Sequence, residues 1–282
     1  MNRIERASTF RPAWPEHDSA KMARDFLLWR HLRVVLARSM RHIRKALGGA
    51  TPGAPVETVY GVKMWPNWGD KTYAYCHYGT YGNYLADLLT SIGEPFCFID
   101  VGANQGLFSL IAGRNPNCRK ILALEPVPAT HDLLARNLAA NGLDSRAEAL
   151  NFGLSGKAGE FPITLSAAHS GLATLGDHAE RFPGEHPKTM VRLETMEELR
   201  RHLPDALPLF IKIDVEGHEE TVIRELLGSP EAARIMGIFY EHDDRWTDKA
   251  AVDALLEGAG FEHSRKYGRG KHYDVLATPL GR

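Results

Sequence analysis

The sequence predicts an α/β fold: a doubly wound, mostly parallel sheet that ends in an antiparallel hairpin, preceded by an N-terminal helical extension. Three observations predict it. Short apolar runs bounded by turns alternate with helical patterns from residue 96 onwards. A glycine-containing loop joins the first of these runs to a helix. Near the C-terminus, two further runs flank a short loop that contains Gly268 and Gly270, which is typical of a hairpin.

Changes in composition divide the 282 residues into three parts. Residues 1–50 are a basic helical extension, residues 51–95 a hairpin and a helix that lead into the core, and residues 96–282 the sheet domain. Since the net charge is only −1, the chain as a whole has no attraction to polyanions. We therefore expect no nucleic acid as a partner.

The extension is expected to form one helix over residues 19–47, which begins after Ser19 and ends at Gly48-Gly49. Against one acid, Asp25, it carries eight basic residues: Lys21, Arg24, Arg30, Arg33, Arg38, Arg41, Arg44 and Lys45. The simplest expectation is a packed helix with a solvated basic face. Peripheral contact with an anionic membrane, binding of an acidic acceptor and self-association are the alternatives.

The elements follow in order. Val56–Met64 and Lys71–His77 are predicted to form a hairpin, and residues 81–92 a helix. The core strands are expected at Phe96–Val101, Lys120–Leu124, Ala147–Phe152, Leu209–Asp214 and Ile235–Glu241. The core helices are expected after Gly106 and at Ala129–Ala140, Glu219–Leu227 and Asp248–Gly258. Additional strands are expected at Glu160–Leu165 and Lys188–Leu193, and the closing pair at Phe261–Arg265 and His272–Ala277.

Three cysteines, Cys76, Cys97 and Cys118, form no CxxC pair and are too few for a disulfide framework, so a reducing compartment is expected. No apolar run is long enough for a membrane-spanning helix, and residues 1–20 lack the apolar stretch of a signal peptide. These features favour a cytoplasmic location, peripheral to a membrane if the basic helix binds lipid.

The loop from Asp100 to Gly106 joins the first core strand to its helix. Gly102 allows a sharp turn and a close approach of the backbone to a ligand. Gly106 opens the helix, whose free N–H groups favour an electron-rich partner. The loop predicts a nucleotide-like ligand at the carboxyl edge of the sheet; a plain strand–helix turn is the alternative.

Three features indicate what kind of nucleotide the loop binds. The spacing Gly102, Asn104, Gly106 is not G-x-G-x-x-G, so the glycine that admits a pyrophosphate is missing. Asp100 would repel a phosphate but suits a cationic amino or sulfonium group. Glu125 follows Gly106 by about 20 residues, where an acid accepts hydrogen bonds from ribose hydroxyls. S-adenosylmethionine meets all of these conditions.

The third core strand ends in Asn151 and Phe152, at the edge expected to face the adenine. Asn151 could hydrogen-bond the base and Phe152 could stack on it; a core phenylalanine beside a turn is the alternative. Titratable side chains crowd the ends of the next two strands. They are Asp214, Glu216, His218 and Glu219, and then Glu241, His242, Asp243 and Asp244.

Four segments together resemble the FkbM family of methyltransferases: Phe98–Gly106, Glu125-Pro126, the string Lys212–Glu219 and Glu241-His242. The loop from His169 to Leu175 is also similar. The resemblance implies a class I methyltransferase Rossmann-like fold and methyl transfer from S-adenosylmethionine to a hydroxyl oxygen of a small-molecule or glycan acceptor, namely a sugar, glycolipid or other natural-product alcohol. The residues expected to bind the cofactor are Asp100, Gly102, Ala103, Asn104, Gly106, Glu125, Pro126, Asn151, Phe152, Asp214 and Tyr81.

An alcohol acceptor needs a base, because a neutral hydroxyl is a poor nucleophile. The candidates are His242, His218, Asp214 and Glu216. If the reaction used a bound Mg²⁺ ion, its oxygen ligands would come from Asp214, Glu241 and either Asp243 or Asp244. Among the aromatic residues before the first core strand, Tyr78 and Tyr81 are expected at the mouth of the site.

Two other functions remain open from the sequence. One is an NAD-linked oxidoreductase, which the missing G-x-G-x-x-G and the closing hairpin disfavour. The other is a non-catalytic Rossmann-like binding protein, which the acids Asp100, Glu125 and Asp214 disfavour.

Overall fold

The computed structural model describes residues 35, 39, 53–165, 170–172, 187–267 and 270–280, without side chains at 262–264. Apart from Val35 and Ser39, the helix expected over residues 19–47 lies outside this part, as does most of the loop between residues 166 and 186. In the part described, no helix combines the length and the apolar character that crossing a membrane requires.

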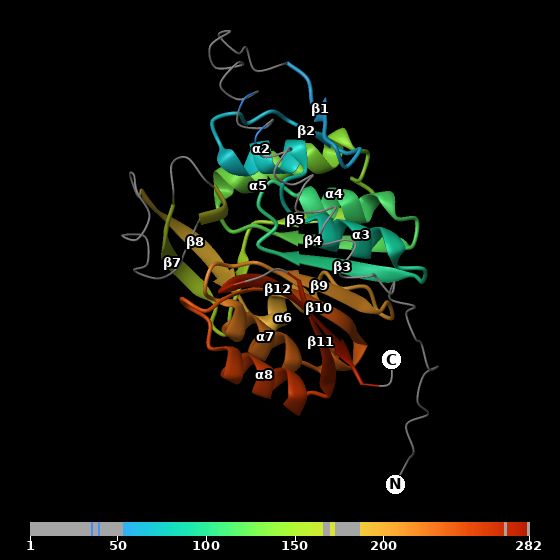
Figure 1. The fold of residues 1–282 in the computed structure, drawn as a ribbon, viewed down its shortest axis with the longest axis vertical. Coiled ribbons are helices and arrows are strands. Elements are labelled where there is room, and N and C mark those ends of the chain that lie inside the picture. The colour runs from blue at the N-terminus through green and yellow to red at the C-terminus, as the bar shows by residue number, and fades with distance from the viewer. Residues whose placement is uncertain are drawn as a thin grey trace.

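A seven-stranded sheet forms the centre of the molecule, with the strand order β11-β12-β10-β9-β3-β4-β5 (Figure 1). Its strands are β3 (Phe96–Val101), β4 (Cys118–Leu124), β5 (Ala147–Leu150), β9 (Leu209–Ile213), β10 (Ile235–Asp243), β11 (Phe261–Tyr267) and β12 (His272–Pro279). The strands from β5 to β10 are parallel, and β12 is antiparallel to both of its neighbours. The predicted class I Rossmann-like fold with its closing hairpin is confirmed.

Helices cover both faces of this sheet (Figure 1). One face carries α3 (Asn83–Ser91), α4 (Leu107–Arg114) and α5 (Pro128–Ala140), and the other carries α6 (Met196–Arg200), α7 (Glu219–Leu227) and α8 (Lys249–Gly258). A short 3₁₀ helix, η3 (Pro230–Arg234), precedes β10. Because both faces are buried, the central strands are nearly continuous apolar runs, which is why the sequence located them well.

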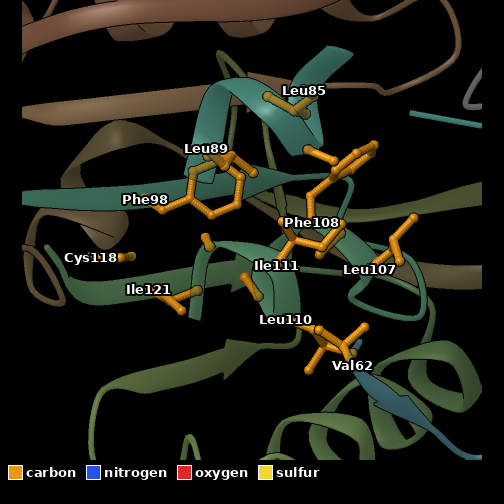
Figure 2. Packing of buried hydrophobic residues seen from close by; sticks show 14 of the residues in the cluster. Val62, Leu85, Leu89, Phe98, Leu107, Phe108, Leu110, Ile111, Cys118 and Ile121 are labelled. Carbon is orange, nitrogen blue, oxygen red and sulfur yellow. The ribbon is translucent and has the colours of Figure 1, made fainter. Parts of the chain in front are cut away.

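The packing between α3, α4 and β3 fixes the start of α4. Phe108 packs among Leu85 and Leu89 of α3 and Phe98 of β3 (Figure 2). Full burial of an apolar side chain of this size stabilises a fold by about 1.5–3 kcal/mol. This packing fixes the position of the loop before α4 relative to the sheet.

The hairpin predicted over Val56–Met64 and Lys71–His77 is wrong. The strands β1 (Val56–Glu57) and β2 (Lys63–Met64) pair with each other, and Lys71–Tyr78 is the helix α2. Asp70 caps α2 by accepting a hydrogen bond from the Thr72 N–H, and Gly79 ends it in the left-handed region at φ 63°. These two caps outweigh the β propensity of the tyrosines in between.

A small second sheet stands beside the large one. It contains β6 (Gly153–Leu154), β8 (Lys188–Glu194) and β7 (Gly159–Thr164), in that order. The two additional strands predicted between residues 160 and 193 are thus confirmed, and they pair antiparallel. A 3₁₀ turn, η1 (Ser170–Leu172), follows β7 in the chain.

Candidate functional site

A cleft opens where β3, β4 and β9 end, at the carboxyl edge of the sheet; it is called the main cleft here. It holds about 700 Å³ of empty space, part of it open to solvent. Its lining residues are Val101, Gly102, Asn104, Glu125, Pro126, Val127, Gly153, Leu154, Ile163, Ser170, Gly171, Leu193, Asp214, Val215, Glu216 and His218. Ligands of open α/β sheets bind at this edge.

The β3–α4 loop forms the floor of the main cleft, and its glycines are sterically required. A Cβ atom on Gly102, at φ 74°, would lie 2.0 Å from the carbonyl oxygen of Asp214. One on Gly106, at φ 89°, would lie 2.5 Å from Leu134. Asn104 also adopts the left-handed conformation, at φ 50°. Because the glycines carry no Cβ atom, the loop packs closely against the end of β9 and the cleft stays open.

Glu125 anchors this loop from the end of β4. One carboxylate oxygen accepts a hydrogen bond from the Asn104 N–H at 2.9 Å, and the other accepts one from the Val127 N–H at 2.9 Å. Burial raises the pKa of Glu125 to about 7, and the two amides oppose that rise. Glu125 lines the main cleft as predicted, but it also shapes the loop.

The structure does not place Asn151 and Phe152, the residues expected to contact the adenine, in the lining of the main cleft. Asn151 donates to the carbonyl oxygens of Glu125 and Pro126 and does not line the cleft. Phe152 is buried in the core on the α6 and α7 face. The apolar wall of the cleft consists instead of residues that the sequence did not single out, namely Val127, Leu154, Ile163 and Leu193. The alternation of apolar residues along β7 and β8 was the available signal.

Asp100 lies below the cleft and does not line it. Its side chain is fully buried, accepts a hydrogen bond from the Ser109 hydroxyl at 2.8 Å and pairs with the Lys212 ammonium at 3.3 Å. Lys212 also donates to the Gly102 carbonyl oxygen at 2.7 Å. Asp100 therefore supports the loop from beneath, and Ala103 and Gly106 likewise shape it without lining the cleft.

The turn after β9 brings three of the predicted catalytic residues to the cleft: Asp214, Glu216 and His218. Glu216 adopts the left-handed conformation at φ 49°, which is uncommon for a residue other than glycine. The Nε2 atom of His218 lies 3.0 Å from the Ser155 hydroxyl, and burial lowers the pKa of His218. His218 is therefore neutral at pH 7 and able to accept a proton.

A smaller space, here the second hollow, lies next to Asp214. It is lined by Tyr81, Gly82, Leu85, Phe108, Lys212, Ile213, Asp214, Phe239, Glu241 and Asp274. The Tyr81 hydroxyl donates to Asp214 Oδ2 at 2.9 Å. Asp214 thus borders both spaces. Tyr81 belongs to the second hollow, and Tyr78 lines neither space.

Carboxylates gather where the two spaces meet. One oxygen each from Asp214, Glu216 and Glu241 lie within 4.8 Å of one another. Burial and then the charge of Asp214 raise the pKa of Glu241 to about 7 and that of Glu216 to about 9. His272 lies 2.5 Å from Glu241, whose carboxylate raises the pKa of His272 to about 9. Burial and the neighbouring negative charge thus favour the protonated forms of Glu216 and Glu241.

Two residues at the end of β10 do not join this cluster. His242 is 1% exposed, lies beside the Tyr273 ring on the α8 face of the sheet, with the ring centroids 4.8 Å apart, and hydrogen-bonds Asp244 at 2.9 Å. Asp243 binds the Arg245 guanidinium. The structure thus places His242 away from both spaces, and Glu216 replaces Asp243 in the carboxylate trio.

The comparisons with known proteins agree with this architecture. The Methyltransferase FkbM domain matches residues 100–263, more than half of the chain. Methyltransferase sdnD of Sordaria araneosa is 33% identical over 205 residues, which are 64% of this chain and 78% of that protein. The hexuronic acid methyltransferase AglP of Haloferax volcanii is 29% identical over 137 residues, which are 49% of this chain and about half (52%) of that protein.

Among solved structures, the M. jannaschii tRNA m1G37 methyltransferase aligns with a TM-score of 0.43 at 14% identity, over 77% of this chain and 51% of that one. A likeness at this level says nothing about the acceptor.

Proposed function

Because this chain belongs to the FkbM methyltransferase family, we propose that it is an S-adenosylmethionine-dependent O-methyltransferase acting on a hydroxyl of a sugar, glycolipid or other natural-product alcohol. The observation that carries the proposal is the position of Asp214, which borders both the main cleft and the second hollow. A donor in one space and an acceptor in the other would meet at this side chain.

The main cleft fits the cofactor. Gly102 keeps the floor free of side-chain atoms, and Glu125 offers carboxylate oxygens for ribose hydroxyls. Pro126 and the apolar wall offer a surface for a flat base. S-adenosylmethionine, when bound, supplies a methyl group activated by a sulfonium. The Asp214 carboxylate, which lines the cleft, suits that positive charge.

The second hollow suits an uncharged acceptor. Tyr81, Asp214 and Glu241 can exchange hydrogen bonds with alcohol groups, and Phe108 and Phe239 add apolar surface. The carboxylates would repel an anionic group at the same place. The AglP relative is named for a hexuronic acid, a sugar with both hydroxyls and a carboxylate, so its name supports a sugar acceptor and the charge of the hollow bears on the choice between the two groups. We therefore favour a neutral hydroxyl over a carboxylate as the methylated group.

Glu241 and Asp214 would take the acceptor proton. The pKa of Glu241, about 7, is close to the pH at which a general base works best. Tyr81 holds Asp214 in place, and His218 stands on the cleft side as a second neutral base. Alignment of the two reactants by the walls of the two spaces would supply much of the remaining rate enhancement.

Family membership favours methyl transfer over the oxidoreductase and the non-catalytic alternatives. The cytoplasmic location stays a prediction. So does a membrane or self-association role for residues 19–47.

Transfer of a labelled methyl group from S-adenosylmethionine to a panel of neutral sugars, glycolipids, alcohols and uronic acids tests the proposal. We expect label in neutral hydroxyl acceptors and a thermal shift with S-adenosylhomocysteine but not with NAD. A shift with NAD alone, or label only in carboxylates, would overturn it. Repeating the assay after chelation tests whether turnover requires a divalent cation; full activity after exhaustive chelation would rule out a catalytic Mg²⁺.

Single substitutions, measured in the same assay, test which groups take the acceptor proton. Asp214→Asn and Glu241→Gln should each lower kcat by about 10²–10⁴-fold, the usual contribution of a general base or of a group that orients it. Glu148→Gln, on β5 outside both spaces, is the matched control and should retain full activity. Unchanged kcat in both site variants would refute the assignment of the base.

A further inference from the structure

We propose that Asp70 is a positioning residue for the cofactor: its carboxylate holds η1 against the β3–α4 loop and so completes one wall of the main cleft. Asp70 precedes residues 100–263, which match the FkbM domain. The inference rests on the proposed function, since it concerns how the same cleft is assembled. Asp70 does not line the cleft and acts through residues that do.

Asp70 is 7% exposed, and its carboxylate joins three segments that are far apart from one another in the sequence. Oδ1 accepts hydrogen bonds from the Thr72 N–H at 2.9 Å and the Ser170 N–H at 3.1 Å. Oδ2 accepts one from the Gln105 side-chain amide at 2.6 Å. One side chain therefore binds the start of α2, the cofactor loop and η1 together.

Further hydrogen bonds reinforce the same junction. The Ser170 hydroxyl donates to Asn104 Oδ1 at 2.9 Å, and the Gly171 N–H donates to the Thr72 hydroxyl oxygen at 3.2 Å. Ser170, Gly171 and Asn104 all line the main cleft. The position of this wall thus depends on hydrogen bonds from Asp70 and Thr72.

A carboxylate suits this position because an ionised acceptor forms stronger hydrogen bonds than a neutral one, and Asp70 receives three donors at once. Asparagine could replace it in part. Its Oδ1 can still accept from the two backbone amides. Its amide nitrogen can donate to Gln105 Oε1, which has no hydrogen-bond partner among the described residues, if the Gln105 amide turns over. Alanine offers none of these contacts.

Calorimetric titration with S-adenosylhomocysteine on the full chain tests the role. Asp70→Ala should raise Kd at least tenfold, and Asp70→Asn should recover most of that loss. In turnover assays Asp70→Ala should raise KM for S-adenosylmethionine at least tenfold, with kcat per folded molecule changed less than threefold. A purely structural role would lower Tm and leave Kd and KM unchanged.

Asp248→Ala is the matched control, because Asp248 caps α8 by accepting from the Ala250 and Ala251 N–H groups and lies outside the cleft. It should lower Tm by a similar amount without changing Kd. If Asp70→Ala does not fold, Thr72→Val, which removes only the acceptor for Gly171, should still raise Kd several-fold.

The outcomes separate the two proposals. If the unaltered chain does not bind S-adenosylhomocysteine, the proposed function fails. If the unaltered chain binds it and Asp70→Ala or Thr72→Val binds it equally well, only the role of Asp70 is refuted.

Discussion

Gly102 lies where the β3–α4 loop contacts the end of β9. Alanine at this position should reduce stability and cofactor binding by more than the strain of a left-handed backbone alone would. Gly102→Ala adds a Cβ atom 2.0 Å from the Asp214 carbonyl oxygen, so the loop and β9 must separate. We expect loss of S-adenosylhomocysteine binding by calorimetry and a lower midpoint of urea unfolding.

Gly142 provides the control for this substitution. It has a similar φ of 67°, and a Cβ there would meet nothing within 4 Å. Gly142→Ala should therefore cost only the left-handed strain, about 1–2 kcal/mol, and leave binding unchanged. Equal losses of stability and binding in the two variants would contradict the steric argument.

Glu216 is expected to reduce stability at high pH. Its pKa is about 9 in the folded chain against 4.5 for the free group, so the folded state holds the proton more tightly than the unfolded state. Its contribution to stability is therefore fully present below about pH 4.5 and declines as the pH rises towards 9.

Replacing this carboxyl with an amide removes that pH dependence. By calorimetry, Glu216→Gln should raise Tm by a few degrees at pH 8, about 1 kcal/mol, with little change at pH 5. Activity should fall, because Glu216 lines the main cleft. The same change in Tm at both pH values would contradict the electrostatic cause.

At the scale of elements, Lys212 fastens β9 to β3 through a buried ion pair with Asp100. Lys212→Met should destabilise the chain by about 3–5 kcal/mol in urea unfolding, because it leaves a buried carboxylate without its cation. Adding Asp100→Asn should recover part of the loss, since no buried charge then remains. A double variant that is no more stable than Lys212→Met would contradict this reason.

An exposed ion pair provides the control for this prediction. Lys120 pairs with Glu148 between β4 and β5, with side chains 29% and 37% exposed. Lys120→Met should cost less than about 1 kcal/mol.

The sequence predicted elements best where local pattern and burial agree. β3 and α7 were located to the residue, because β3 is a short apolar run bounded by turns and α7 is an amphipathic helix with a clear period. The helix α2 was missed because its caps, Asp70 and Gly79, decide its conformation and its apolar pattern is weak. The position of His242 away from both spaces was not foreseen: successive strand residues face opposite sides of the sheet, so Glu241 faces Asp214 and His242 faces the α8 side.

For the whole molecule, the class of fold and the position of the main cleft followed from the alternation of strands and helices and from one glycine loop. The walls of the cleft could not be predicted from these patterns. Asp70, Gln105 and Ser170 are separated by 35 and 65 residues along the chain, and only the folded chain brings them together. Side-chain hydrogen bonds across such distances leave no periodic trace in a sequence.

The strand order also bears on how the chain can fold during synthesis. β12 lies between β10 and β11, and among the described residues β11 pairs with no other strand of the sheet. Until β12 has been synthesised, β10 has an open edge and β11 has no strand to pair with. The earlier strands can assemble as they emerge, but β10 and β11 must wait until β12 has left the ribosome. Until then the open edge of β10 invites pairing with other chains, so newly made protein should depend on chaperones most strongly at this step.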